Sequence, residues 1–332
     1  MIPVRTLPAG PRAATGTTAT RSRVAPRREA PAFEGEYRPR HPLDLHRTVG
    51  IQRRGAHDPT LVVDGPVIWR ASRTPDGVAT LALRAVSGAV RIAAWGPGAE
   101  WALAQAPALC GADDDPANFD AGLHPVVAAA HRRNPGLRLS RTDLVFDALA
   151  GAIFEQKVTG VQAFGAWRRI VARHGTPAPG PTPRPMAAPP SLDGWRRIPS
   201  WDWHRAGLEP PQSRAIVRAA ERGARVAAVL ERASSAERER VLTSLPGIGP
   251  WTSAETRIRA YGDPDAVSVG DYHLAHQVGY ALTGSRTDDD GMLDLLAPWT
   301  GHRQRVIRLL GLSGVQEPRR GPRLHPEDHR DR

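Results

Sequence analysis

Cysteine and lysine are almost missing from this chain of 332 residues, which contains one of each, Cys110 and Lys157. A single cysteine excludes an intramolecular disulfide framework, and it excludes any zinc or iron–sulfur site built from four cysteines of this chain. Such cysteine usage fits a reducing cytoplasm. Aromatic residues are also scarce, at 5% of the chain, so each ring close to a functional motif is a candidate for ligand contact.

Long apolar runs are missing as well. The first forty residues carry eight Arg but no apolar core of the kind that a secretory signal needs, and no run is long enough to span a bilayer. Lys and Arg total 45 against 34 Asp and Glu, with a pI near 11. This excess favours a polyanionic partner, nucleic acid ahead of a membrane surface, although Arg-rich codon usage gives the same balance. We expect a soluble cytoplasmic protein, associated with the nucleoid when it is bound to DNA.

The chain divides into four segments by composition. Residues 1–42 and 316–332 are rich in Arg and Pro without periodicity, which predicts disordered tails. Residues 43–125 contain alternating apolar and polar stretches, with turn signals at Asp64-Gly65 and at Pro75-Asp76-Gly77, followed by a helical stretch at 96–109. Residues 126–315 are helical in pattern. The predicted fold class is therefore α+β, with a small N-terminal antiparallel sheet domain and a larger all-helical domain.

Capping residues mark several helix ends in the larger domain. Thr159 with Gln162, and Ser234 with Glu237, have the spacing of capping boxes. Glycines stand where three helices are expected to stop, at Gly175, Gly262 and Gly284. The Pro-rich stretch 175–191 is expected to form a loop on the surface of this domain.

The stretch "LPGIGPW" at 245–251 places two glycines one residue apart between two helical patterns. Pro250 suits the first position of the second helix, with Gly249 as its cap. Free backbone N–H groups at such a helix start, beside glycines without Cβ atoms, form a site for an anionic oxygen such as a DNA phosphate. Gly247, Gly249 and Thr252 are the candidate phosphate-binding residues. A plain tight turn between packed helices is the alternative.

A carboxylate follows twenty residues further on, in "VSVGDYHLAH" at 267–276. Asp271 opens an amphipathic helix, where the positive field of a helix N-terminus favours the ionised carboxylate. Its role is either that of a helix cap alone or that of a functional anion. His273 and His276 share a face of this helix, but their spacing from Asp271 is poor for a metal site, so no metal is expected.

Together, "LPGIGPW" and "VSVGDYH" resemble the glycine hairpin and the catalytic aspartate region of the helix-hairpin-helix DNA glycosylase superfamily. The stretch 134–160, "NPGLRLSRTDLVFDALAGAIFEQKVTG", resembles the entry to the helical domain in the DNA-3-methyladenine glycosylase II (alkyl-base) type. The resemblance covers roughly residues 45–315. It implies an enzyme of base excision repair that acts as a monomer on double-stranded DNA with alkylated bases.

The resemblance implies a role for each motif. Asp271 assists cleavage of the bond between base and deoxyribose, and Trp251, Tyr272 and Trp299 line the pocket for the flipped base. The physics agrees, because an alkylated base is cationic, is attracted by ring faces and leaves readily once an anion stabilises the sugar cation. A core position at a helix start is the alternative for Trp299. No cofactor is implied except a monovalent cation between hairpin and phosphate.

The lyase branch of the superfamily carries a nucleophilic lysine just after the hairpin, where this chain has Trp251. An indole cannot form a Schiff base, so the resemblance implies a monofunctional glycosylase. Two rivals are a bifunctional glycosylase/lyase that uses Lys157 and a non-catalytic protein that binds damaged DNA. The sequence does not rank alkyl-adenine, alkyl-guanine and deaminated purine as substrates.

Two departures from the family pattern stand out. Glu255 lies one helical turn after Trp251, where the alkyl-base branch can carry an aromatic residue, so it belongs either to the base pocket or to an exposed pair with Arg259. Gln156 and Lys157 fall on the turn that, in the family, inserts an apolar wedge into the gap left by the flipped base. The lone lysine reflects either chance in an Arg-biased chain or selection for its ammonium group.

Overall fold

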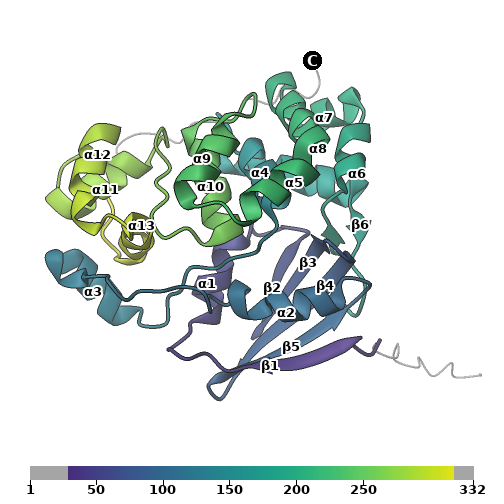
Figure 1. The fold of residues 1–332 in the computed structure, drawn as a ribbon, viewed down its shortest axis with the longest axis horizontal. Helices are drawn as coiled ribbons and strands as arrows, with labels where there is room; N and C mark the ends of the chain where they lie inside the picture. Colours follow the sequence, from purple (N-terminus) through teal and green to yellow (C-terminus); the bar gives the residue numbers. More distant parts are fainter. Residues whose placement is uncertain (1–28, 318–332) are drawn as a thin grey trace, which may run out of the picture.

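A five-stranded antiparallel sheet is followed by helices in the computed structural model, which describes residues 29–317 (Figure 1). The strand order in the sheet is β1-β5-β4-β3-β2. The bounds of the strands are β1 (Phe33–Tyr37), β2 (Leu61–Asp64), β3 (Val67–Thr74), β4 (Gly77–Val86) and β5 (Ala89–Trp95). The connections β2–β3 and β3–β4 fall at the two predicted turns, and the α+β fold class is confirmed.

Strand β1 corrects the predicted tail over 1–42. Its backbone pairs antiparallel with β5, from Phe33 opposite Ala94 to Tyr37 opposite Val90. The sequence FEGEY alternates Phe, Gly and Tyr with two Glu, but it is short and has no β-branched residue, and the strand forms because β5, more than fifty residues later, offers it a free edge. Residues 1–28 and 318–332 of the two predicted tails lie outside the described residues.

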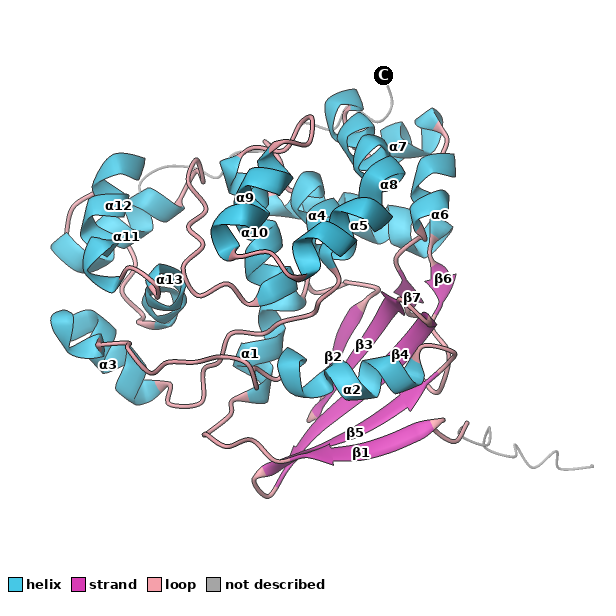
Figure 2. Cartoon of the chain, viewed as in Figure 1, coloured by secondary structure: helices cyan, strands magenta, loops and turns pink. Residues whose placement is uncertain are grey.

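One face of the sheet is covered by helix α2 (Ala99–Leu109), which packs on β1, β4 and β5 (Figure 2). The short helices α1 (Leu45–Val49) and η1 (Gly50–Gln52) lead into the sheet, and η2 (Ala121–Leu123) follows α2. The side chains that this layer buries include Leu45, Ile68, Leu83, Ile92 and Leu109. The sheet domain therefore has a core of its own.

The helices beyond the sheet domain have two separate cores. The first, here called the hairpin lobe, comprises α4 (Val145–Phe154), α5 (Gly160–His174), α6 (Leu192–Arg197), α7 (Ser200–Ala206), α8 (Pro210–Glu231), α9 (Ser235–Thr243) and α10 (Pro250–Tyr261). The second, here called the α11 lobe, comprises α3 (Pro125–Arg133), α11 (Leu274–Thr283), α12 (Asp289–Leu296), η3 (Ala297–Trp299) and α13 (Arg303–Leu312). Figure 1 shows the two lobes side by side, with the sheet domain below the hairpin lobe.

The predicted helix ends agree with the structure. Both capping boxes form, at Thr159 with Gln162 and at Ser234 with Glu237. The glycines at 175, 262 and 284 are the residues at which α5, α10 and α11 end. Within residues 29–317, no helix combines the length and the apolar character that crossing a membrane requires.

The composition of the Pro-rich stretch 175–191 predicted a surface loop, but only part of the stretch forms one. It contains two short strands, β6 (Thr176–Pro177) and β7 (Ala187–Ala188), and residues 186–190 are buried. Met186 and Ala188 pack on Val62 and Ala71 of the sheet. Apolar Met, Ala and Pro side chains are stabilised there by covering the sheet, so this stretch joins the sheet domain to the hairpin lobe.

Candidate active site

The glycine hairpin joins α9 to α10, and its two glycines have different reasons to lack a side chain. Gly247 has a φ of +87°, and a Cβ there would lie 3.1 Å from the Cβ of Ala215, so the turn itself favours glycine. Gly249 has a φ of −95°, and within residues 29–317 no heavy atom other than those of its chain neighbours lies within 4 Å of the place of its Cβ. Nothing inside the protein requires glycine at 249. The open space in front of it is available to an outside molecule.

Helix α10 begins at this hairpin with Pro250, and its cap residue Gly249 offers no side-chain hydrogen bond. The backbone N–H groups of a first helical turn have no partner within the helix. A helix start of this kind, uncapped and beside open space, is suited to an anionic oxygen. This geometry supports the predicted phosphate site at Gly249.

The predicted wedge residues separate in the structure. The side-chain amide of Gln156 donates to the backbone oxygen of Gly247 at 2.9 Å and to the hydroxyl of Thr252 at 2.8 Å. Gln156 therefore fastens the turn between α4 and α5 to the hairpin, and its side chain is not free to enter DNA. Thr252 is 3% exposed and its hydroxyl accepts from Gln156, so the group left for the predicted phosphate contact is its backbone N–H in the first turn of α10. Only Lys157 is exposed at this turn, with a φ of +55°.

Asp271 links the two helical lobes. One carboxylate oxygen accepts hydrogen bonds from the backbone N–H groups of His273 at 2.9 Å and Leu274 at 3.0 Å, so the side chain satisfies the first N–H of α11, although the helix begins later than expected, with His273 as its cap residue. The other oxygen accepts a hydrogen bond from the indole nitrogen of Trp251 on α10 at 3.1 Å. Asp271 is partly exposed, so this oriented carboxylate is accessible to a ligand.

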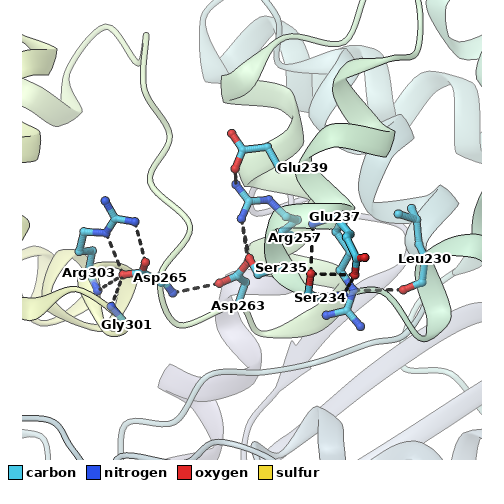
Figure 3. A network of polar contacts seen from close by, with 11 residues as sticks. Leu230, Ser234, Ser235, Glu237, Glu239, Arg257, Asp263, Asp265, Gly301 and Arg303 are labelled. Atoms are coloured by element: carbon cyan, nitrogen blue, oxygen red, sulfur yellow. Dashed lines mark hydrogen bonds and ion pairs between the residues drawn. The ribbon is translucent and has the colours of Figure 1, made fainter.

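The loop from Gly262 to Asp271 is held at its start by the polar network of Figure 3. Arg257 donates to Asp263 at 2.9 Å and to Glu239 at 3.0 Å. Asp265 accepts from the Arg303 guanidinium at 2.6 and 2.8 Å, at the start of α13. Burial by itself would raise the pKa of Asp265, but the hydrogen bonds from Arg303 outweigh it and hold the pKa below its usual value. The network ties the hairpin lobe to the α11 lobe.

The three rings predicted to line a base pocket lie in different surroundings. Trp251 is partly buried beside Asp271, while Tyr272 is 77% exposed and packs edge-on against the ring of His273. Trp299 is 5% exposed within the core of the α11 lobe, and its indole nitrogen donates to the backbone oxygen of Asp120 at 2.7 Å. The pocket assignment of Trp299 is thus corrected. Its burial supports the alternative of a core residue, although Trp299 ends η3 and does not start a helix.

Glu255 forms the pair with Arg259 that the helical spacing suggested, but the pair is not on an exposed face. The side chains of Glu255 and Arg259 are 16% and 13% exposed, and the second carboxylate oxygen of Glu255 accepts a hydrogen bond from the hydroxyl of Ser268. Burial by itself would lower the pKa of Arg259, but the charges of Glu255 and Glu155 outweigh it and raise that pKa. Arg259 therefore stays charged at any physiological pH.

Sequence reasoning missed the residues that extend this pair. Glu155, which ends α4, lies 3.9 Å from Arg259 and 3.6 Å from Arg54, whose side chain is 7% exposed. The Arg54 guanidinium also lies over the ring of Trp167, 4.8 Å from its centroid. The Arg54 guanidinium fills the space that a Cβ on Gly151 would need. That glycine inside an apolar helix pattern was the one local signal of a close approach.

The histidines near Asp271 have other partners. A ring nitrogen of His276 forms a hydrogen bond with the backbone oxygen of Thr287 at 2.9 Å, and the ring of His273 packs against Tyr272. Across residues 29–317, no three His, Cys, Asp or Glu side chains are grouped in a way that could hold a metal ion.

Comparisons with known proteins support the resemblance. No protein-family model matches the chain. A protein of Mycobacterium tuberculosis, described as a probable bifunctional transcriptional activator/DNA repair enzyme AlkA, is 30% identical over 154 residues. That match covers 46% of this chain and 30% of the relative, so the chain aligns with less than a third of the relative's length.

Solved structures of DNA glycosylases match most of the chain, among them the following two. The 3-methyladenine DNA glycosylase of Archaeoglobus fulgidus has a TM-score of 0.72 at 16% identity, covering 83% of this chain and 97% of its own. The 8-oxoguanine glycosylase/lyase of Clostridium acetobutylicum, without DNA, has a TM-score of 0.68 at 11% identity, covering 87% and 98%. The chain therefore shares the fold of these two glycosylases.

Proposed function

We propose that the protein is a monofunctional DNA glycosylase that removes alkylated purines from duplex DNA. The observation that carries the proposal is the Asp271 carboxylate, which is oriented by Trp251 and by two backbone N–H groups and lies twenty-two residues after an open glycine cap. A phosphate at the start of α10 would position the duplex, and the carboxylate would act on the nucleotide. The names of the similar proteins, 3-methyladenine glycosylase and AlkA, support alkylated bases as substrates.

The chemistry needs few protein groups. Alkylation of a ring nitrogen gives the purine a positive charge, so the base already leaves readily. As the bond from sugar to base breaks, positive charge develops on the sugar, and a nearby carboxylate stabilises it. Asp271 would supply this anion and orient the water that attacks the sugar carbon. Trp251, partly buried beside it, offers a ring face to the cationic base.

A monovalent cation at the hairpin fits the residues present. The backbone oxygen of Gly247 accepts a hydrogen bond from Gln156 and keeps a second lone pair for a cation. The backbone oxygens of the hairpin would hold the ion, whose charge would attract a phosphate oxygen. Gly249 would leave room for that phosphate because it has no side chain.

Strand cleavage by a lysine is the rival activity. A Schiff-base mechanism needs an amine that reaches the sugar carbon beside Asp271. The one lysine, Lys157, is on the turn between α4 and α5, and the residue that approaches the Asp271 carboxylate is Trp251. These positions support hydrolysis without strand cleavage.

Mass analysis of bases released from methylated duplex DNA tests the proposal, together with a denaturing gel of the strand. We expect free methylated purines and an uncut strand that breaks only after alkali treatment. A strand cut without alkali would support the lyase. Tight binding of methylated DNA with no released base would support a non-catalytic damage-binding protein.

A further inference from the structure

Helix α10 holds the Asp271 segment at two points, one helical turn apart. The first is the hydrogen bond from Trp251 to the Asp271 carboxylate at 3.1 Å. The second is made by Glu255, whose carboxylate accepts from the hydroxyl of Ser268. The backbone oxygen of Ser268 in turn accepts from the backbone N–H of Asp271 at 3.2 Å. Two hydrogen bonds thus lead from Glu255 to the main chain of Asp271.

Both members of the second contact are shielded from water. Ser268 is 3% exposed, and the Glu255 side chain is 16% exposed. A hydrogen bond between a hydroxyl and an ionised carboxylate is stronger than one between neutral groups, and it gains further strength in a region of low dielectric constant. The contact is therefore strong enough to fix the distance between α10 and the loop.

Glu255 is itself fixed in place. One of its carboxylate oxygens is paired with Arg259, which leaves the other for Ser268. Arg259 lies 3.9 Å from Glu155, and Glu155 lies 3.6 Å from Arg54 of the sheet domain. This chain of alternating charges holds the Glu255 carboxylate in one position. A side chain held in this way can act as a rigid support for a functional residue.

The other anchors of the loop lie to either side of Ser268. Asp263 and Asp265 fix the start of the loop, and the backbone N–H of Gly270 donates to Asp289 at 2.9 Å. Between them, Ala266 packs on Ala254 and Ile258 of α10, the helix that bears the proposed phosphate site. Ser268 adds a hydrogen bond to the same helix, and together with the bond from Trp251 its contact with Glu255 sets the distance from that site to Asp271.

We propose that Glu255 is a positioning residue for glycosidic bond cleavage and that it acts through Ser268 to place the Asp271 carboxylate against the sugar. This inference rests on the proposed function. An anion stabilises developing charge only at the right distance, and a displacement of about 1 Å can lower a rate about a hundredfold. When the contact between Glu255 and Ser268 is lost, Asp271 keeps its hydrogen bonds to Trp251 and to the start of α11. The loss should therefore lower the rate by less than a hundredfold.

The test is Ser268→Ala, assayed by single-turnover release of one methylated purine from a duplex. We expect the rate constant to fall about tenfold while affinity for the same duplex stays within about twofold, because no DNA contact is removed. Ser313→Ala is the matched control, since Ser313 is also a buried serine that donates one hydrogen bond, at 2.7 Å to Leu310. It should keep the wild-type rate. Thermal unfolding of both variants verifies the fold.

A double mutant distinguishes positioning from general loss of stability. Glu255→Met removes the acceptor, and if Glu255 acts through Ser268, adding Ser268→Ala to it should change the rate constant less than about twofold. A wild-type rate in Ser268→Ala would overturn the inference, even if Glu255→Met failed to fold. Multiplied effects in the double mutant would overturn it as well. If the wild-type protein released no base, the proposed function would fail first, and the inference with it.

Discussion

The indole nitrogen of Trp251 donates a hydrogen bond to the Asp271 carboxylate at 3.1 Å. By resemblance, position 251 is where the lyase branch carries its nucleophilic lysine. In this chain the residue at that position orients the carboxylate. The two residues stand twenty apart in sequence and belong to different lobes. The role of the Asp271 charge and the role of the hairpin can be tested separately, each with its own variant.

Asp271→Asn should remove most base excision while leaving affinity for damaged DNA within a few fold. Asn loses the negative charge and keeps one acceptor oxygen, which can serve either the two backbone N–H groups or the Trp251 donor. Loss of one well-placed charge costs about 3 kcal/mol of barrier, or at least about a hundredfold in rate. Single-turnover kinetics measure it, with the exposed Asp294→Asn as control. Near-normal turnover would reduce Asp271 to a helix cap.

Gly249→Val should weaken binding to intact and damaged duplexes alike, by about tenfold or ~1.4 kcal/mol. The folded protein has open space for the new side chain, so the cost falls on the phosphate. Binding of the wild type should fall steeply with salt, and loss of one phosphate contact should reduce that slope by about one.

Gly50→Val is the control for this prediction, because Gly50 also has no atom within 4 Å of a Cβ and a φ of −58°. Titrations by fluorescence anisotropy at several salt concentrations measure both variants. Unchanged duplex affinity in folded Gly249→Val would mean that no phosphate approaches this glycine.

Gln156→Ala should weaken binding of every duplex because it frees the hairpin from the turn between α4 and α5. The variant loses the hydrogen bonds to Gly247 and Thr252, and the hairpin must then be ordered when DNA binds. We expect equal losses on damaged and intact DNA in the same titration. A loss confined to damaged DNA would restore the wedge role that the resemblance implied for Gln156.

Lys157→Ala should affect damaged DNA only. As a wedge, Lys157 fills the gap left by the flipped base, so its loss slows flipping without creating or abolishing strand cleavage. Lys157→Leu, closer to an apolar wedge, should recover much of the loss, and borohydride should trap no adduct. Stopped-flow fluorescence of a base analogue measures flipping. A trapped adduct that disappears in Lys157→Ala would instead identify the lysine as a nucleophile.

Asp147 predicts a pH dependence of stability. Burial raises its pKa from 3.8 to about 6, against the opposing charges of Arg70, Arg54 and Arg73. Because the pKa is raised in the folded state, the favourable contribution of the Asp147 carboxyl to folding is complete below pH 4, where it is protonated in both the folded and the unfolded protein. That contribution is lost as the pH rises through 6. From pH 4 to pH 7, Asp147→Asn should therefore gain about 2 kcal/mol of unfolding free energy relative to wild type. Denaturant unfolding at both pH values measures this, and the difference should not change with pH if the carboxyl titrates normally.

Several features of this protein follow from local sequence alone. Alternation between 60 and 95 determined the four strands β2–β5, and the side chains of Thr159 and Ser234 determined where α5 and α9 begin. Asp271 was recognisable as a cap, and Gly249 before Pro250 as a helix start. These features depend on backbone dihedral angles and on hydrogen bonds between residues two to four apart, which a short stretch of sequence contains in full.

Tertiary structure alone decided which candidate side chains face outward. Gln156 and Thr252 looked like DNA-contacting residues, but they bond to each other across ninety-six positions. Trp299 is buried, and its indole nitrogen donates to the backbone oxygen of Asp120. Glu255 on α10 accepts a hydrogen bond from Ser268 in the loop before α11. A polar or aromatic side chain is available to DNA only if no distant segment of the chain satisfies it first. The identity of that segment depends on how the lobes pack, since packing brings together residues that no local pattern relates.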